Sequence, residues 1–224
     1  MEDWEALRGC LLFRGLDPAQ TALLLGGQAE RYPERTTVIH DGARIDRLEV
    51  LLTGSMRAIR HNVDGTEFLY QQLRPGYLVA GEVACTPKRT CPYTVYAPEA
   101  CTTWWFPRDR LEDGGLPAPL RLTLLENLLH FVANQNIRKF YKIDALSVKS
   151  ARQRILKYLI AQAQRTGSAH FTIPFDREAM ANYLCLNRSV LSHELRRMEA
   201  EGLIRFRKSD FTLLDEKLVE QHTM

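Results

Sequence analysis

The sequence is poor in cysteine, and its few cysteines are scattered. There are five among 224 residues, with no C-x-x-C pair and no histidines at the spacing of a zinc site. An odd number of widely separated cysteines argues against the disulfide framework of small secreted domains. We therefore expect reduced thiols at all five positions: Cys10, Cys85, Cys91, Cys101 and Cys185.

Long apolar runs are also missing. No stretch reaches the roughly 18 residues that a membrane-spanning helix needs. The first residues, MEDWEALRG, are acidic where a secretory signal would be basic. The sequence predicts a cytoplasmic protein with no membrane partner, and 45% hydrophobic residues are enough for a sizeable core.

Catalytic constellations are equally sparse. The sequence shows no nucleophile–base pair, no glycine-rich phosphate loop and no metal-binding cluster. A metal enzyme built on a small β-barrel needs two or three inward-facing histidines and a carboxylate, whereas residues 32–106 hold only His40 and His61, in different segments. We expect neither an enzyme nor a metal site.

Charge is nearly balanced over the whole chain, with a net charge of +3, but its distribution is uneven. Residues 1–144 carry 17 basic and 18 acidic side chains, and residues 145–224 carry 13 and 9. The positive excess therefore lies in the C-terminal part, where a polyanionic partner is expected to bind.

Short apolar segments separated by turns occupy residues 32–106. Glycines recur there every 11 or 12 residues, which is the spacing of an antiparallel sandwich or barrel. The pattern predicts an α+β protein in which residues 1–115 form a jelly-roll-like β-barrel. The predicted turns are Asp41-Gly42, Thr53-Gly54, Asp64-Gly65 and Pro75-Gly76.

A long apolar helix is predicted within residues 116–144. Its leucines and aromatic residues cover more of the helical circumference than one buried stripe needs, so two faces must be covered. One face can pack on the barrel and the other on the same helix of a second chain, which predicts a two-fold homodimer. The open alternative is a central helix of a monomeric core. The expected dimer contacts are Leu124, Leu128, Phe131, Val132 and Gln135.

Residues 145–224 are predicted to form a small helical domain that ends in a hairpin. Asp176 is a plausible N-cap for a helix over REAMANYL, and a tight turn at Cys185 and Leu186 leads into a second helix, NRSVLSHELRRMEAEG. Two short helices joined in this way form a helix-turn-helix. After Gly202 the alternating segment LIRFRKSDFTLL predicts a hairpin wing.

The second of these helices has a distinct polar face. Leu191, Leu195 and Met198 recur at helical spacing and should face the core, which leaves polar side chains on the exposed arc. Recognition helices meet the major groove of DNA with their first turns, and arginine is the commonest reader of guanine. We therefore predict double-stranded DNA as a partner, with a merely solvated helix as the alternative. The expected DNA contacts are Asn187, Arg188, Ser189, Ser192, His193 and Arg196, joined by Arg177, Arg207 and Lys208.

With these features in place, the sequence resembles the Crp–Fnr family of bacterial transcription regulators along nearly its whole length. The resemblance is carried by LLTGSMRAI and DGTEFLYQQLRPGYLVAGE in the barrel, by the long helix, and by NRSVLSHELRRMEAEGLI. It implies a cyclic-nucleotide-binding-like barrel that senses a small-molecule effector or a redox signal, a dimerisation helix with a hinge, and a winged helix-turn-helix over residues 145–224. It also implies a palindromic site with half-sites about 34 Å apart, and RNA polymerase as a further partner.

The sequence departs from this family where the signal would be sensed. It keeps Gly81-Glu82 but has CPY at residues 91–93, where members that bind cyclic AMP have an Arg-Ser pair for the phosphate. Lys88 and Arg89 lie nearby and could substitute, but their TPKRT segment resembles a surface loop. Only Cys10 lies where the iron–sulfur members have several cysteines. We expect no cyclic AMP, iron–sulfur cluster or haem, and the effector stays unidentified. The expected effector-site residues are Gly81, Glu82, Cys91, Tyr93, Lys139 and Phe140.

Two other functional interpretations stay open. Cys85, Cys91 or Cys101 could form a thiol-based redox or metal switch, and the helix-turn-helix could bind a protein partner instead of DNA. In the second helix many relatives have glutamate at the place of Ser189 and arginine at the place of His193, which predicts a different half-site.

Overall fold

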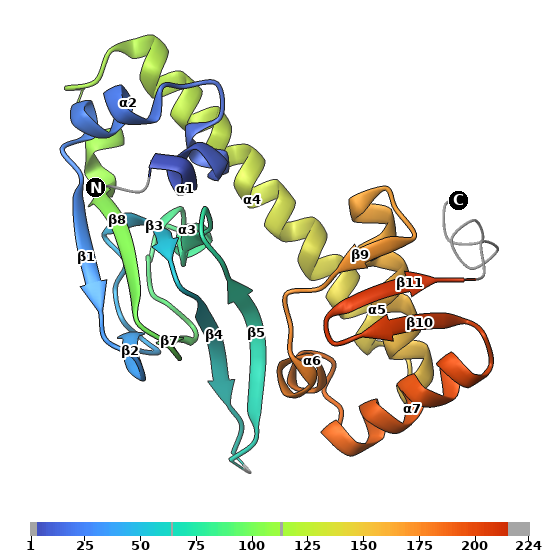
Figure 1. Cartoon of the computed structure of the whole chain (residues 1–224). Coiled ribbons are helices and arrows are strands. Elements are labelled where there is room, and N and C mark those ends of the chain that lie inside the picture. Colours follow the sequence, from blue (N-terminus) through green and yellow to red (C-terminus); the bar gives the residue numbers. More distant parts are fainter. Residues whose placement is uncertain (1–3, 64, 113, 215–224) are drawn as a thin grey trace. The chain divides into compact units, whose positions relative to one another are not determined.

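The computed structural model describes residues 4–63, 65–112 and 114–214, which form two compact units (Figure 1). The first unit comprises Met1–Gly65 and Tyr70–Asn136, and the second comprises Thr66–Leu69 and Ile137–Met224. The long helix α4 (Ala118–Leu146) contributes residues to both units. These two compact units do not coincide with the three domains predicted from the sequence, which are residues 1–115, 116–144 and 145–224. The predicted domain boundaries stay a prediction.

Three short helices begin the first unit: α1 (Trp4–Gly9), η1 (Leu11–Phe13) and α2 (Pro18–Leu25). α2 begins where the Asp17 side chain accepts a hydrogen bond of 3.0 Å from the Gln20 amide, with a proline at the first helical position. It ends at Gly26, whose left-handed conformation lets its amide bond back to the last turn. Figure 1 shows these helices beside the first half of α4.

Two four-stranded sheets form the body of the first unit, in the orders β1-β8-β3-β6 and β2-β7-β4-β5. The ladders described between their strands are antiparallel. This arrangement confirms the predicted α+β fold with an N-terminal jelly-roll-like barrel. The strands are β1 (Gln28–Tyr32), β2 (Thr36–Ile39), β3 (Arg47–Thr53), β4 (Met56–His61), β5 (Glu67–Leu73), β6 (Leu78–Val79), β7 (Thr94–Ala97) and β8 (Cys101–Pro107), with the short helices α3 (Gly81–Ala84) and η2 (Arg108–Leu111) between and after them.

The predicted turn glycines adopt the backbone conformation that turns require. Gly42, Gly54, Gly65 and Gly76 all have positive φ, between 78° and 87°. Gly54 is the most constrained of them, because a Cβ there would lie 2.7 Å from the Ala100 carbonyl oxygen and 2.8 Å from the Cys101 Cβ. The turn prediction is confirmed at these four positions.

The core of the first unit lies between the sheets and under the N-terminal helices. Leu48 and Val50 of β3 and Val95 of β7 belong to one buried apolar cluster. Trp104 of β8 is buried in it and meets the Phe13 ring edge-on, with ring centroids 5.7 Å apart. Because alternate residues of a strand face opposite sides, the neighbouring Trp105 lies on the other face and is only half-buried.

The second unit contains two helices that lead into a helix-turn-helix and a small sheet. Asp176 caps α6 as predicted, since its side chain accepts a hydrogen bond of 2.7 Å from the Ala179 amide. The wing hairpin is confirmed, and β9 pairs with it to make a three-stranded sheet in the order β10-β11-β9. The elements after α4 are α5 (Ala151–Thr166), β9 (His170–Thr172), α6 (Arg177–Tyr183), α7 (Arg188–Ala200), β10 (Ile204–Arg207) and β11 (Asp210–Leu213).

Candidate functional sites

The polar face of α7 is the best-formed candidate site of the second unit. Leu191, Leu195 and Met198 are fully buried, as their spacing predicts. The opposite arc carries the six predicted DNA contacts, of which five are exposed and Ser192 is half-buried. The exposed five are Asn187, Arg188, Ser189, His193 and Arg196. The helix thus presents a polar arc over its first three turns, with the 40% exposed Val190 beside it.

The turn before α7 contains a strained residue. Cys185 is exposed and has φ of 53°, in the left-handed region where a β-carbon clashes with the backbone at a cost of about 1–2 kcal/mol. Arg154 of α5 holds this turn, because its Nη1 donates to the Cys185 carbonyl at 3.2 Å while its Nε donates to the Val148 carbonyl at 2.8 Å. Sequence reasoning missed Arg154, since nothing distinguishes it from the other basic residues of α5.

Replacing Cys185 by glycine is expected to stabilise the second unit by about 0.5–1 kcal/mol. Glycine removes the left-handed strain, and the backbone entropy it adds to the unfolded chain offsets part of that gain. Urea denaturation followed by circular dichroism measures the difference. Cys185→Ala is the matched control because it also removes the thiol but keeps the β-carbon. An equal gain in both variants would show that the thiol, and not the strain, is responsible.

The wing places its predicted contacts in different environments. Arg207 and Lys208 are exposed near the tip of the β10–β11 hairpin. Arg177 instead packs into the unit: its guanidinium lies over the Phe206 and Phe211 rings, 4.7 and 5.2 Å from their centroids, and Nη2 donates to the Lys208 carbonyl at 2.8 Å. Burial lowers the pKa of Arg177. Arg177 therefore braces the wing against α6, a role that the sequence did not predict.

The predicted effector residues of the first unit meet around α3. The Tyr93 hydroxyl donates to Glu82 Oε1 at 2.9 Å, and the Tyr70 hydroxyl donates to the same oxygen at 3.4 Å. The two phenol rings stack with centroids 5.0 Å apart. A Cβ on Gly81 would lie 2.7 Å from the Leu78 Cβ and 3.0 Å from the Phe131 ring of α4, so this turn requires glycine. Tyr70 was missed, because an alternating strand pattern does not show which tyrosine faces α3.

Two of the predicted effector residues lie in the other unit. Lys139 and Phe140 follow Asn136 in α4 and belong to the second unit, while the residues around α3 belong to the first. Lys139 is half-buried and Phe140 is 65% exposed. Their predicted part in an effector site stays a prediction.

Three of the four cysteines of the first unit, Cys10, Cys91 and Cys101, are buried, whereas Cys85 is exposed. Burial raises the pKa of Cys91 and of Cys101 to about 11 each, and that of Cys10 to about 12. Cys91 is fully buried, and its Sγ donates to the Tyr93 carbonyl at 3.2 Å. Since the thiolate is the reactive form, these environments disfavour a thiol switch at Cys91 or Cys101, and a switch at the exposed Cys85 stays a prediction.

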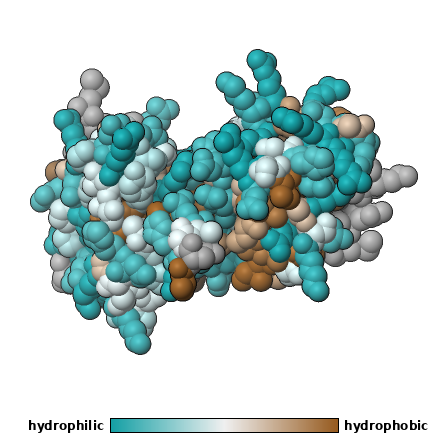
Figure 2. Space-filling model, turned by 90° about the horizontal axis from the view of Figure 1, so that it is seen from below, coloured by the Kyte–Doolittle hydropathy of each residue, from teal (hydrophilic) through white to brown (hydrophobic). Residues whose placement is uncertain are grey.

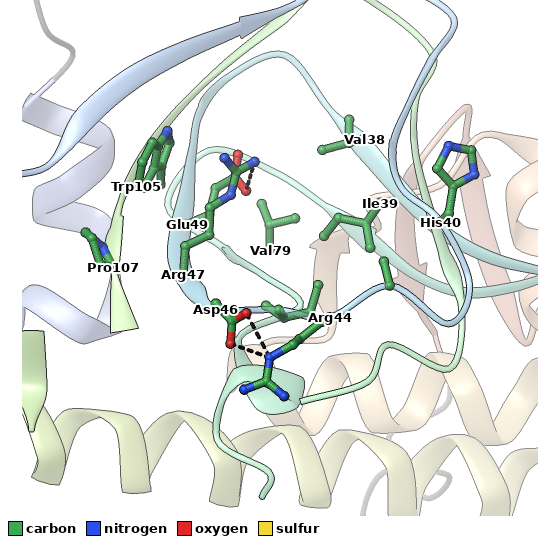
Figure 3. A pocket seen from close by; sticks show the side chains of 12 residues that line it. Val38, Ile39, His40, Arg44, Asp46, Arg47, Glu49, Val79, Trp105 and Pro107 are labelled. Carbon is green, nitrogen blue, oxygen red and sulfur yellow. Dashed lines mark hydrogen bonds and ion pairs between the residues drawn. The ribbon is translucent and has the colours of Figure 1, made fainter. Parts of the chain in front are cut away.

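A hollow of about 450 Å³ opens between β2, the loop after it, β3 and β8 (Figure 3). Arg47 crosses it, pairing with Glu30 at 2.7 Å and with the buried Glu49 at 2.9 Å. Burial raises the pKa of the Glu49 carboxyl, although Arg47 and hydrogen bonds from Tyr32 and Thr103 oppose the rise. The size of the hollow suits a small molecule. Its two arginines are already in ion pairs, Arg44 with Asp46 and Arg47 with Glu30 and Glu49, so neither offers an unpaired positive charge to an anionic ligand.

The residues of α4 that were predicted as dimer contacts pack within their own chain instead of on its surface. Leu124, Leu128 and Phe131 are buried in the core of the first unit, Val132 packs against it, and Gln135 is buried. Their own chain covers these side chains, so they form the barrel-facing side of the helix. The exposed apolar side chains are Leu122, Leu125, Leu129, Ile137, Phe140, Tyr141 and Ile143. Figure 2 shows a few apolar patches on one face of the molecule that is otherwise largely hydrophilic.

Two structural features bear on membranes and metals. Over residues 4–63, 65–112 and 114–214, no helix is long and apolar enough to cross a membrane. In the same ranges, no three His, Cys, Asp or Glu side chains gather where they could bind a metal ion together.

Comparison with solved structures finds the same fold in several proteins. FixK2 from Bradyrhizobium japonicum has 16% sequence identity and a TM-score of 0.67, over 87% of this chain and 96% of that one. The c-di-GMP responsive global regulator CLP of Xanthomonas campestris has 19% identity and a TM-score of 0.66, over 88% and 99%. The catabolite activator protein of Thermus thermophilus has 24% identity and a TM-score of 0.51, over 94% and 97%. At these identities the likeness shows the fold alone.

Comparison with curated protein sequences finds no match at a significant level. Two protein-family models do match. The cyclic nucleotide-binding domain matches residues 29–114, which contain the sheets and α3, and the Crp-like helix-turn-helix domain matches residues 153–221, which contain α6, α7 and the wing. Both matches fall on the elements described above, in the order expected, and the long helix α4 lies between them. The chain belongs to the Crp–Fnr family of transcription regulators.

Proposed function

We propose that this regulator binds a palindromic double-stranded DNA site as a homodimer, with α7 of each chain in the major groove. The observation that carries the proposal is the polar arc of α7 opposite its buried leucines. Arg188 stands at the first position of the helix, where a long side chain reaches the edges of the bases, and it can bond two acceptors of one guanine. Half-sites would lie about 34 Å apart, one turn of the duplex.

The wing would contribute contacts that carry no sequence information. Arg207 and Lys208 are exposed on one hairpin and can pair with phosphates beside the groove. Arg177 would act indirectly, because its stacking on Phe206 and Phe211 and its bond to the Lys208 carbonyl hold that hairpin in place. We place the protein in the cytoplasm, with RNA polymerase as a further partner.

The dimer would form along the exposed stripe of α4. Leu122, Leu125 and Leu129 are spaced three and four residues apart and remain 46–67% exposed. Phe140 and Ile143 continue the same spacing further along the helix. Such a stripe packs against its symmetry-related copy as knobs into holes. Large exposed leucines in one row have a high solvation cost in a monomer, which supports a partner helix.

Selection of bound duplexes from a random DNA pool, followed by sequencing, tests this function. A two-fold symmetric motif with half-sites about one turn apart is expected. Affinity for that motif should fall steeply with salt, with a log–log slope near −0.9 for each phosphate neutralised. Absence of a motif under both reducing and oxidising conditions would favour a protein partner at the helix-turn-helix instead.

A further inference from the structure

The barrel matches a cyclic nucleotide-binding domain over residues 29–114, so the fit of that ligand to this chain can be tested on its residues. A cyclic nucleotide brings an anionic phosphate, which needs a cation or several free backbone amides close by. Cys91 and Pro92 stand where the resemblance implies an arginine and a serine. Proline has no amide hydrogen to donate, and the Cys91 thiol already donates to the Tyr93 carbonyl. These residues do not fit the phosphate.

The carboxylate that remains at this place is already occupied. Oε1 of Glu82 accepts hydrogen bonds from the hydroxyls of Tyr93 and Tyr70. In the part of the chain that the structure describes, Glu82 forms no ion pair, so no cation accompanies its carboxylate at this place. Burial and the Glu82 charge both raise the pKa of Tyr93, so its hydroxyl keeps the proton that it donates.

We infer that the Tyr93–Glu82–Tyr70 cluster closes the ligand site beside α3 and that the barrel takes no cyclic nucleotide there. The two stacked phenols supply the apolar surface and the hydroxyl donors that a bound nucleoside would otherwise bring to Glu82. The turn at Gly81 already packs on Phe131 of α4 within the first unit. α3 is therefore held against α4 by the chain's own side chains.

Calorimetry and hydrogen exchange test the two parts of this inference on the full chain. Titration of the wild-type protein with cyclic AMP and with cyclic GMP should show no binding. Tyr93→Phe keeps the ring but removes the shorter hydrogen bond to Glu82, so exchange of the backbone amides of residues 82–85 should accelerate about five- to tenfold. Tyr96→Phe is the matched control, because Tyr96 lies in β7, three residues after Tyr93, is half-buried, and its hydroxyl has no hydrogen bond to Glu82 in the part of the chain that the structure describes.

Either of two results would overturn the inference. One is binding of a cyclic nucleotide to the wild-type chain, one per protomer, with a dissociation constant in the low micromolar range. The other is an exchange rate at residues 82–85 that is the same in Tyr93→Phe as in Tyr96→Phe. If Tyr93→Phe does not fold, Tyr70→Phe removes the longer of the two bonds and should give a smaller acceleration at the same amides. Neither measurement uses DNA, so a failure here leaves the proposed DNA-binding function to its own test.

Discussion

Replacing Arg188 by alanine is expected to weaken binding to the selected DNA motif by about 1–3 kcal/mol, which is roughly 5- to 150-fold. Arg188 is exposed at the start of α7, where its guanidinium can donate two hydrogen bonds to one guanine. Loss of that bidentate contact should also relax the sequence preference at one base position of each half-site. Fluorescence anisotropy with the motif, with single-base variants of it and with random duplex measures both effects.

Arg197→Ala provides the control for this prediction. Arg197 lies near the C-terminal end of the same helix and pairs with Glu201 at 3.2 Å, so its loss removes one charge without removing a base contact. We expect its effect to be small and equal on motif and random DNA. An equal loss on both duplexes for Arg188→Ala would make Arg188 a phosphate contact, and no loss on either would contradict a groove position for the start of α7.

The double substitution Leu125→Glu and Leu129→Glu is expected to convert the dimer to a monomer. Both side chains are exposed within one chain, so the first unit should fold normally. In a paired helix, four carboxylates would be buried against apolar side chains and against one another, which costs several kcal/mol. The dimer dissociation constant should rise at least about a hundredfold, as sedimentation equilibrium can measure.

His130→Glu is the control on the same helix. His130 is also exposed, but the helical repeat of 100° per residue places it well away from the stripe of Leu122, Leu125 and Leu129. This variant should stay dimeric. The double variant should also lose most of its affinity for the two-fold motif, because a monomer contacts one half-site only. A stable dimer in the double variant would show that α4 pairs through another surface or that the contact lies elsewhere.

Much of the fold followed from the sequence because local chemistry dictates it. Glycines at regular intervals sit where only positive φ closes the turns, so Gly42 and Gly54 located the strands of the barrel. Asp176 and the spacing of Leu191, Leu195 and Met198 defined α6 and α7. The exposed face of α7 could be predicted for the same reason: once the buried residues of a short helix are known, the opposite arc is known too.

The faces of α4 were decided by the tertiary structure. Periodicity shows that a helix has two apolar rows but not which row its own chain covers. In the structure, Leu124, Leu128 and Phe131 are buried in the core of the first unit. The closing of Glu82 by Tyr93 and Tyr70 was equally invisible, because the three residues come from separate segments. Arg177, predicted as a DNA contact, stacks on Phe206 of the wing. Arg154, which the sequence did not single out, donates a hydrogen bond to the turn before α7.

The sequence by itself therefore determined the order of the elements, their turns and caps, and the polar arc of α7, since each depends on neighbours within a few residues. Only the tertiary structure decided which side chains of α4 remain for a partner and what fills the place beside α3. Both outcomes depend on which side chains from distant segments fill the same buried space and donate to the same hydrogen-bond acceptor. A pattern within a few neighbouring residues cannot show this.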